Sequence, residues 1–330
     1  MSKEVIIYHT EINEDSSPDN LDVLKEAEFV SENLKKLGYS PRVLQFTYDK
    51  EKIKSEINKI NPKFIFNFVE SINGTDSLAY LAASLFERLK IPYTGCSAKS
   101  LFQTSDKLIA KEILKKNKIK TPKYLNLNNY KSMHITGKEK FLIKNSKEHS
   151  SFGLNEANFS LLDNKKDIIK ALKNKDEKYF AEEYIDGREF NISILGNSIQ
   201  ILPIAEMKFN NYDEKKPKIV GYRAKWDEDS YEYKNTIRNF DFGEKDRLLL
   251  KRLKEICIKC WNLFSLNGYA RIDFRVKKQI PYVLEINDNP CLSPDAGFIA
   301  AAERAGLSHT RVIKEIIKDL IKKKNNSLKN

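Results

Sequence analysis

YARIDFRV at residues 269–276, followed after a short turn by PYVLEINDNP at residues 281–290, decides the fold of this chain. Successive side chains of a strand point to opposite faces, so each stretch divides into odd and even positions. The even positions are all apolar, which predicts one buried face: Ile272, Phe274, Val276, Ile280, Tyr282, Leu284 and Ile286. A hairpin turning at residues 277–279 then gathers the polar odd positions on the opposite face: Arg271, Asp273, Glu285 and Asn287.

The polar face of this hairpin carries the ligand atoms of a metal site. Asp273, Glu285 and Asn287 offer carboxylate and amide oxygens, the set that suits Mg²⁺ beside water and phosphate oxygens. Two carboxylates with only Arg271 beside them repel each other unless a cation lies between them. An ordinary half-exposed hairpin would place the same groups in solvent. Asparagine is a poor strand residue, however, and the sharp turn NDNP follows at once, so a functional site is favoured.

Length and charge limit the class of protein. The chain has 330 residues and a formal charge of +12, from 58 basic and 46 acidic side chains. Its length predicts two or three packed lobes, and a hydrophobic fraction of 41% is sufficient for a buried core. A positive balance favours anionic partners such as nucleotide phosphates. No basic stretch is interleaved with aromatic residues, as single-stranded nucleic acid requires, so we expect no nucleic-acid partner.

The N-terminus and the cysteines predict a cytoplasmic protein with reduced thiols. The opening MSKEVIIY does not form a signal peptide, and no apolar run reaches the roughly 18 residues of a membrane span, so we expect no membrane partner. Cys257 and Cys260 form a CxxC within a predicted helix, and no second Cys/His pair follows at zinc spacing. We therefore expect them at buried helix positions, not in a metal or redox site.

Strands and helices alternate over the first 95 residues, which predicts a parallel sheet with helices on its faces. The expected strands are 5–8, 42–46, 64–69 and the short IPYTG at 91–95, and the expected helices are 20–37, 49–60 and 76–89.

The pattern changes after residue 140, where short strands predict an α+β lobe. The expected strands are 141–144, 179–185, 189–195 and 199–204. The remaining expected helices are 105–118, 165–173, 244–266 and 309–323. Residues 207–240 are polar, aromatic and irregular, and we expect them to form loops that close the site.

Three stretches before the hairpin bear on phosphate chemistry. TSDKLIAKEIL places Lys107 in the first turn of a helix, and FLIKNSKEHSSFGL places Lys144 at the end of a strand. The loop after Lys144 contains Ser150, Ser151 and Gly153, a turn that can direct successive backbone N–H groups at an anion. YFAEEYIDGREFNISILG then runs a strand into an Asp-Gly turn and out again. Each stretch is weak alone, but their order before the hairpin indicates nucleotide binding.

With these motifs in this order, the chain resembles the ATP-grasp superfamily and, within it, the D-alanine–D-alanine ligase family. The matching stretches are IPYTG, SDKLIAK, FLIK with SSFGL, EEYIDGREFNISILG, YRAKW, GYARIDFRV and LEINDNPCLSP. The resemblance runs from about residue 62 to the C-terminal helix. It implies an α/β protein with the ATP-grasp fold. Its expected parts are a Rossmann-like (pre-ATP-grasp) N-terminal domain at 1–100, a small central α+β lobe at 101–190, and a C-terminal α+β lobe with the metal site at 191–330.

The resemblance implies that ATP binds between the central and C-terminal lobes. Lys107 and Lys144 would contact its phosphates, and Glu189 would bind the ribose hydroxyls. The loop that covers the phosphates would contain Ser150, Ser151, Gly153 and the backbone to Leu154. The adenine would be held by the main chain of Glu182, Glu183, Tyr184 and Ile185.

The resemblance also implies the reaction. A substrate carboxylate attacks the γ-phosphate of ATP to give an acyl phosphate, and an amine then displaces phosphate to form an amide. Lys225 would reach the transferring phosphoryl group, and Arg271 would stabilise the acyl phosphate and the oxyanion formed from it; with Ser150 and Ser151 these are the expected catalytic residues. Two Mg²⁺ ions, with Mn²⁺ as a substitute, would be bound by Asp273, Glu285 and Asn287. The substrates would be small amino acids or peptides, and a homodimer is compatible with the resemblance.

The chain departs from the family where the substrates bind. The family has a glycine-rich segment with a Ser and a Glu after its first strand; here HTEINEDSSPDN contains no glycine. The residues that could replace that Glu are Glu11, Glu14 and Asp15. His149, Cys291 and Ala296 stand where the family has Gly, Gly and a carboxylate-binding Ser. Asp295 would repel a carboxylate, so we expect a different amino acid or peptide substrate, with an acceptor that carries a positive or neutral group.

Three alternatives remain open beside that ligase. A genuine D-alanine–D-alanine ligase would share every ATP-binding motif. An ATP-grasp kinase acting on a small molecule would stop at phosphoryl transfer. A non-catalytic binding module is disfavoured because the phosphate-binding lysine and the three metal ligands are all present.

Overall fold

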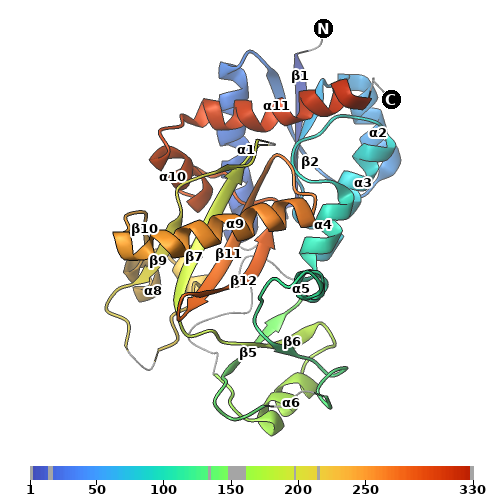
Figure 1. Cartoon of the computed structure of the whole chain (residues 1–330). Helices are drawn as coiled ribbons and strands as arrows, with labels where there is room; N and C mark the ends of the chain where they lie inside the picture. The colour runs from blue at the N-terminus through green and yellow to red at the C-terminus, as the bar shows by residue number, and fades with distance from the viewer. Residues whose placement is uncertain are drawn as a thin grey trace.

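The computed structural model describes residues 3–13, 18–132, 135–147, 161–196, 198–213 and 216–327. Three β-sheets follow one another along the molecule, each with its own covering helices (Figure 1). The sheet nearest the two termini is built by the N-terminal residues, and the smallest sheet lies at the opposite end. The three sheets, with the helices packed on them, therefore divide the molecule into three parts. The boundaries at residues 100 and 190 stay a prediction.

The first sheet is parallel, in the order β2-β1-β3, as the alternation of strands and helices predicts. Its strands are β1 (Glu4–His9), β2 (Ser40–Gln45) and β3 (Phe64–Phe68). Its helices are α1 (Pro18–Lys36), α2 (Lys50–Ile60), the short η1 (Asp76–Leu78) and α3 (Tyr80–Arg88). Val5 and Ile7 pack toward α1, whereas Ile6 and Tyr8 pack toward α2 and α3. Both faces of the sheet are thus covered, which explains why every residue of β3 is buried.

The smallest sheet is antiparallel, in the order β4-β6-β5. It consists of β4 (Tyr124–Leu125), β5 (Phe141–Asn145) and β6 (Tyr179–Glu183), with α6 (Lys165–Lys173) packed on one face. Asn164 caps α6 by accepting from the Asp167 N–H, and Ile168 and Leu172 provide its buried stripe. This sheet contains the first two of the strands expected after residue 140, whereas the strands expected at 189–195 and 199–204 belong to the largest sheet.

The largest sheet has the order β10-β9-β7-β11-β12, with β8 (Gln200–Ile201) pairing β7. Its other strands are β7 (Arg188–Leu195), β9 (Ala205–Phe209), β10 (Thr236–Asn239), β11 (Tyr269–Lys277) and β12 (Ile280–Asn287). Helix α9 (Arg247–Leu263), which follows η2 (Glu244–Asp246), crosses one face of this sheet (Figure 1). Cys257 and Cys260 are fully buried on the inner side of α9 as free thiols, as expected. Burial raises the pKa of Cys260 to about 12.

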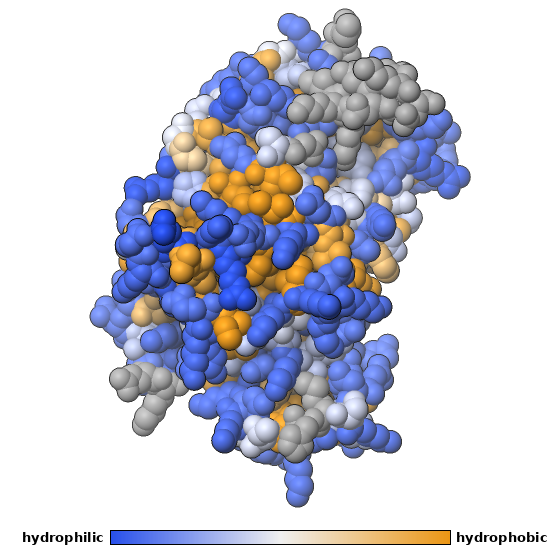
Figure 2. Space-filling view, viewed as in Figure 1, coloured by the Kyte–Doolittle hydropathy of each residue, from blue (hydrophilic) through white to orange (hydrophobic). Residues whose placement is uncertain are grey.

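The last two helices connect the largest sheet to the first. α10 (Gly297–Arg304) and α11 (His309–Ser327) share a core with α1 and with the odd residues of β1. Figure 2 shows hydrophilic side chains over most of this side of the molecule, with apolar ones gathered between α11 and α9. Within the described part of the chain, no helix is long and apolar enough to cross a membrane.

Several expected elements are wrong in extent. The helix expected at 105–118 is α5 (Lys107–Lys116), and the helix before it, α4 (Ala98–Ser105), was not predicted. Asp106 separates the two because it is extended and caps α5 by accepting from Leu108 and Ile109 N–H. The strand expected at 91–95 is a single bridge between Ile65 and Tyr93. The strand expected at 199–204 is reduced to β8.

The region 207–240 is also more regular than expected. It contains the end of β9, α7 (Tyr222–Trp226), α8 (Tyr231–Asn235) and β10. β10 pairs antiparallel with β9, from Thr236 opposite Phe209 to Asn239 opposite Glu206. Elements this short have little intrinsic preference and depend on the partner that they pack against, so periodicity does not reveal them.

The hairpin β11–β12 forms as predicted, but its alternation is interrupted. Phe274 pairs with Val283 while Asp273 pairs with Glu285, so Leu284 is the extra residue of a β-bulge. Pro281 and Val283 are buried in place of Ile280 and Tyr282. The prediction of a buried face is therefore correct for Ile272, Phe274, Val276 and Ile286, and wrong for Ile280, Tyr282 and Leu284.

A single methyl group at Gly187 should test the packing between β6, β7 and β11. A Cβ at this position would lie 2.1 Å from the Val276 carbonyl oxygen, so the backbone would have to move. We expect Gly187→Ala to lower the free energy of unfolding by about 1–3 kcal/mol in urea denaturation. Gly243→Ala is the matched control, because nothing lies within 4 Å of its Cβ and its φ is −84°. Equal stability of the two variants would contradict the packing described.

Candidate active site

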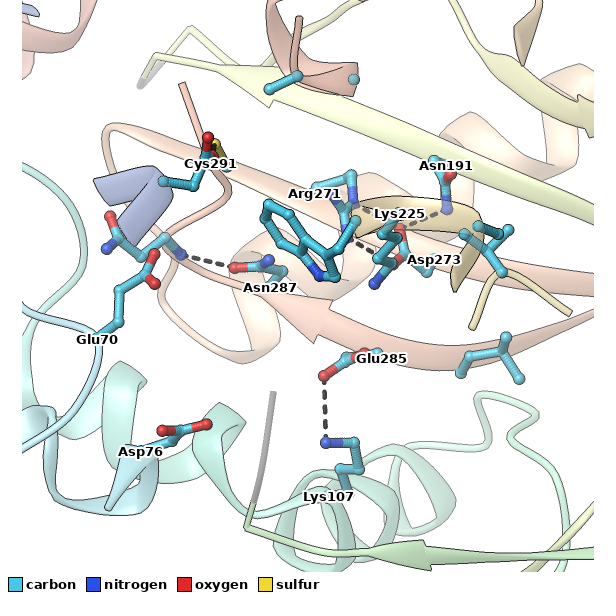
Figure 3. Close-up of a pocket in the computed structure, with 18 of the residues that line it drawn as sticks. Glu70, Asp76, Lys107, Asn191, Lys225, Arg271, Asp273, Glu285, Asn287 and Cys291 are labelled. Carbon is cyan, nitrogen blue, oxygen red and sulfur yellow. Dashed lines mark hydrogen bonds and ion pairs between the residues drawn. The ribbon is translucent and has the colours of Figure 1, made fainter. Parts of the chain in front are cut away.

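A cavity of about 860 Å³ is lined by strands of the two antiparallel sheets and by helices and loops that surround them. β5 and β6 contribute one wall, β7, β9, β11 and β12 another, and α1 together with the loop after β3 closes one end. Figure 3 shows the polar residues of this cavity. Almost every residue that the hairpin and lysine motifs predict to bind is found here, which makes the cavity the candidate active site.

The polar face of the hairpin forms the centre of the cavity. Asp273 lies opposite Glu285 and Arg271 opposite Asn287 in the strand register, as expected from strand alternation. Arg271 Nε and Nη2 donate to the two oxygens of Asp273 at 2.8 and 3.0 Å, a bidentate pair. Asn191 of β7 donates to Asp273 Oδ1 at 2.8 Å (Figure 3). Burial opposes the charge of Arg271, but Asp273 outweighs it and raises the pKa of the guanidinium.

The donor set at the hairpin fits a magnesium ion. Asp273, Glu285 and Asn287 present oxygen ligands to one cavity, and Lys107 Nζ lies 3.4 Å from Glu285 Oε1. In the described residues no three His, Cys, Asp or Glu side chains converge, so the site has two carboxylates and one amide. Mg²⁺ typically takes one or two carboxylates and completes its shell with water and phosphate oxygens. Arg271 and Lys107 form ion pairs with the two carboxylates that the ion would contact.

Glu182 on β6 lies between two lysines. Its oxygens pair with Lys111 Nζ at 2.6 Å and with Lys144 Nζ of β5. Burial alone would raise the pKa of Glu182, but Lys111 and then Lys144 outweigh burial and lower it to about 2. Lys144 and Glu182 line the cavity, so the predicted phosphate-binding lysine is in place. Lys111 was not predicted, because one more lysine on an amphipathic helix carries no distinguishing signal.

Glu189 on β7, the expected ribose ligand, also faces the cavity. Its side chain is buried, and Arg275 Nη2 of β11 lies 2.9 Å from Oε2 without the angle of a hydrogen bond. Burial raises the pKa of Glu189, and Arg275 opposes this. Oε2 is therefore a buried acceptor that a sugar hydroxyl can satisfy, which is the observation that fits a nucleotide. The sequence reasoning missed Arg275, which also donates to the Gly187 carbonyl at 2.8 Å.

Lys225 and Trp226 reach the cavity from α7. Figure 3 shows Lys225 beside Arg271 and Asp273. Burial, and then the charge of Arg271, lowers the pKa of Lys225, while nearby Glu285 and Asp273 oppose that shift. The Trp226 indole Nε1 is buried and has no hydrogen-bond partner among the described residues. α7 therefore supplies the predicted lysine from the region expected to close the site.

The expected adenine segment is only partly at the cavity. Glu182 lines it, whereas Glu183, Tyr184 and Ile185 are absent from the lining that the described residues form. The N–H groups of Glu183 and Tyr184 donate to the carbonyls of Lys123 and Lys140 at 2.8 and 2.7 Å. The predicted phosphate-covering loop, with His149, Ser150, Ser151, Gly153 and Leu154, lies outside the described residues.

One end of the cavity is acidic, and the sequence reasoning missed it. The carboxylates there are Asp22, Glu26, Glu70 and Asp76. Of the three acids predicted to replace the family's glutamate, Glu11 is exposed and is not part of the described lining, while Glu14 and Asp15 lie outside the described residues. Asp22 and Glu26 are four residues apart beside the buried Val23 and Ala27 of α1. That spacing was the signal, since it places both acids on the face that meets the core.

Cys291 lies at this acidic end. Its thiol donates to Asp22 Oδ2 at 3.2 Å, and Ser293 Oγ donates to the same oxygen at 2.9 Å. The Leu292 N–H donates to Glu26 Oε1 at 2.6 Å. Burial, with Glu26 and Asp22, raises the pKa of Cys291 well above its ordinary value. The contact of Cys291 with Asp22 therefore ties the segment after β12 to α1.

The cationic side chain of Arg238 lies beside α10. Arg238 of β10 donates to the Asp295 carbonyl at 3.2 Å, and its guanidinium is the nearest group to a Cβ built on Gly297. Ala296 is the N-cap of α10 and gives no side-chain hydrogen bond. Asp295, Ala296 and Gly297 all line the cavity. The segment in which the sequence departs from the family therefore forms part of the wall.

The arrangement of the three sheets, with a cavity that gathers the predicted metal ligands and the predicted phosphate-binding lysines, is that of an ATP-grasp protein. The model for "D-ala D-ala ligase C-terminus" matches residues 116–318, more than half of the chain. The chain belongs to the D-alanine–D-alanine ligase family.

Two kinds of relative support this assignment. A D-alanine–D-alanine ligase of Aquifex aeolicus is 30% identical over 299 residues, 89% of this chain and 94% of that protein. The solved D-alanine–D-alanine ligase of Bacillus anthracis in complex with ATP has a TM-score of 0.74 at 20% identity, covering 98% of this chain and 99% of that one. The VanG D-Ala:D-Ser ligase of Enterococcus faecalis has a TM-score of 0.69 at 18% identity, covering 97% and 100%. At these identities the solved structures show the ATP-grasp fold alone.

Replacing Glu182 by glutamine should remove a contribution to the free energy of unfolding that the wild-type protein loses in acid. The folded pKa of Glu182 is about 2, below its ordinary value of 4.5, so its ionised form stabilises the fold above that ordinary value. This contribution, about 3 kcal/mol, is lost as the pH falls from about 4.5 to about 2. In urea unfolding at several pH values, wild type should exceed Glu182→Gln at neutral pH, and the difference should shrink in acid. A difference that does not change with pH would contradict the pairing.

Proposed function

We propose that this chain is an ATP-dependent, ADP-forming carboxylate–amine ligase that works through an acyl phosphate. One observation carries the proposal. A single cavity gathers phosphate-directed lysines, a buried acceptor for a sugar hydroxyl, and a hairpin of oxygen ligands paired with an arginine. Phosphoryl transfer depends mainly on positioning and on neutralising charge around the γ-phosphate, and this set of groups does both.

Each group has one part in the reaction. Lys107 and Lys144 hold the phosphates of ATP, and Glu189 holds the ribose. Lys225, a half-buried lysine beside the hairpin, follows the transferring phosphoryl group. Arg271 neutralises the acyl phosphate and then the oxyanion that forms when the amine attacks. Ser150, Ser151 and Gly153 are proposed to cover the phosphates and exclude water.

Magnesium and ATP are the proposed cofactor and co-substrate. Asp273, Glu285 and Asn287 would hold two Mg²⁺ ions, with Mn²⁺ able to replace them, and Glu285 would contact both. Mg²⁺ bound there neutralises charge on the phosphate oxygens. Arg271 and Lys107, which pair with Asp273 and Glu285, would then add positive charge beside the phosphates.

The substrate is proposed to be an amino acid or peptide other than D-alanine. The acidic end, with Asp22, Glu26, Glu70 and Asp76, supports a substrate that presents an ammonium group to α1. Burial, with Glu70 and Asp22, raises the pKa of Glu26. Asp295 extends the same sign of charge to the wall near α10. A homodimer and a cytoplasmic location stay predictions.

A screen of substrate pairs tests this function. We expect purified protein with Mg·ATP to release phosphate only when both a carboxylate substrate and an amine substrate are present, because the acyl phosphate needs an acceptor. L- and D-amino acids and short peptides are tested in pairs, and products are identified by mass spectrometry. D-alanine alone is one arm, and efficient formation of its dipeptide would overturn the proposed change of substrate. A stable phosphorylated product without amine-dependent phosphate release would instead identify a kinase.

Removing one metal ligand tests the magnesium site. Glu285→Gln keeps the size of the side chain and removes its charge, so we expect the Mg²⁺ concentration for half-maximal ATP turnover to rise about 100-fold. Glu255→Gln, on the exposed side of α9, is the matched control and should leave this value unchanged. An unaltered Mg²⁺ dependence in Glu285→Gln would exclude the proposed ligand.

A further inference from the structure

Lys111 is a buried ammonium behind the wall of the cavity. It lies on α5 one turn after Lys107, and only 1% of its side chain is exposed. Its Nζ lies 2.6 Å from Glu182 Oε1 and donates to Thr121 Oγ1 at 2.8 Å. It is not part of the lining that the described residues form, whereas Glu182 and Lys144 are. Lys111 therefore reaches the cavity only through Glu182.

The charges of this group decide what Lys144 can do. Glu182 holds Lys144 through its second oxygen, and a single carboxylate cancels the charge of a single ammonium. A pair of Lys144 and Glu182 alone would present no net charge to a phosphate. With Lys111 on the other oxygen, the three side chains carry a net charge of +1. Since Lys111 does not line the cavity, a phosphate in the cavity meets this net positive charge at Lys144.

We propose that Lys111 is a positioning residue for nucleotide binding: it neutralises Glu182, so that Glu182 can orient Lys144 without cancelling the charge that Lys144 offers to phosphate. The inference rests on the ATP site of the proposed function. It explains why an ammonium is buried where an apolar side chain could pack, since burying a charge is costly unless it is paired. Of the two lysines, Lys111 lowers the pKa of Glu182 more than Lys144 does.

A structural role alone would give a different pattern. If Lys111 only tied α5 to β6, its loss would lower stability and weaken adenosine and ATP to the same extent. A charge-balancing role acts on the phosphates, so its loss weakens ligands in proportion to their phosphate charge. Adenosine and a nonhydrolysable ATP analogue therefore separate the two roles.

The test is a charge cycle of four proteins. Wild type, Lys111→Met, Glu182→Gln and the double variant carry net charges of +1, 0, +2 and +1 on these three side chains. Binding of the ATP analogue and of adenosine is measured by calorimetry on the full chain with Mg²⁺, after folding is verified by circular dichroism. We expect Lys111→Met to weaken the ATP analogue about tenfold or more, and adenosine less than about twofold. The double variant should regain most of the lost affinity, because the positive charge at Lys144 is restored.

Lys115→Met is the matched control, because Lys115 lies one turn further along α5 and is largely exposed. It should bind the ATP analogue like wild type. Unchanged binding in Lys111→Met, equal weakening of both ligands, or a double variant as weak as Lys111→Met would each overturn the inference. If Lys111→Met does not fold, the double variant decides alone: near-normal affinity supports the inference and weak affinity overturns it.

The outcomes also separate this inference from the proposed function. If the wild-type protein does not bind the ATP analogue, the proposed ATP site itself is overturned. Wild type that binds it, with the expected charge pattern but no amide product in the substrate screen, would leave the role of Lys111 standing and overturn the ligase.

Discussion

The pairing of β11 with β12 is the constraint on which the rest of the site depends. It places Asp273 directly opposite Glu285 and Arg271 opposite Asn287, so that one register fixes the proposed metal ligands and the arginine proposed to stabilise the oxyanion. The bulge at Leu284 sharpens this arrangement. It lets the first half of β12 bury Pro281 and Val283 while the second half turns Glu285 and Asn287 to the cavity. A shift by one residue would bury both ligands.

The part of the fold that could be predicted from sequence is the part set by local periodicity. β1, β3, β7 and β11 have long apolar or alternating runs, and the expected strands coincide with them. The missed elements are those whose existence depends on distant partners. β10 is a strand because β9 lies beside it, and α4 is separate from α5 because one residue, Asp106, prefers to cap a helix to continuing one. The bulge leaves no trace in the apolar pattern, because Leu284 continues it.

The same distinction holds for the site. Asp273, Glu285 and Asn287 could be found because they lie within one hairpin, where spacing alone determines which face they share. Contacts across the chain could not be found this way. Glu26 of α1 meets Leu292 across 266 residues, and Glu182 of β6 meets Lys111 of α5. The spacing of Glu26 from Asp22 indicates only that both acids face the core, and nothing in the sequence around Lys111 distinguishes it from other lysines on amphipathic helices.

The two ends of the cavity carry opposite charge, and this polarity has a chemical consequence. Lys107, Lys144 and Lys225 line the part of the cavity proposed to hold the nucleotide, and the carboxylates of α1 and of the loop after β3 line the other end. In the proposed reaction, an amino acid would turn its carboxylate toward Arg271 and its ammonium toward Glu26 and Glu70. The carboxylate would then face the γ-phosphate, so that the field that selects a zwitterionic substrate would also orient it for phosphoryl transfer.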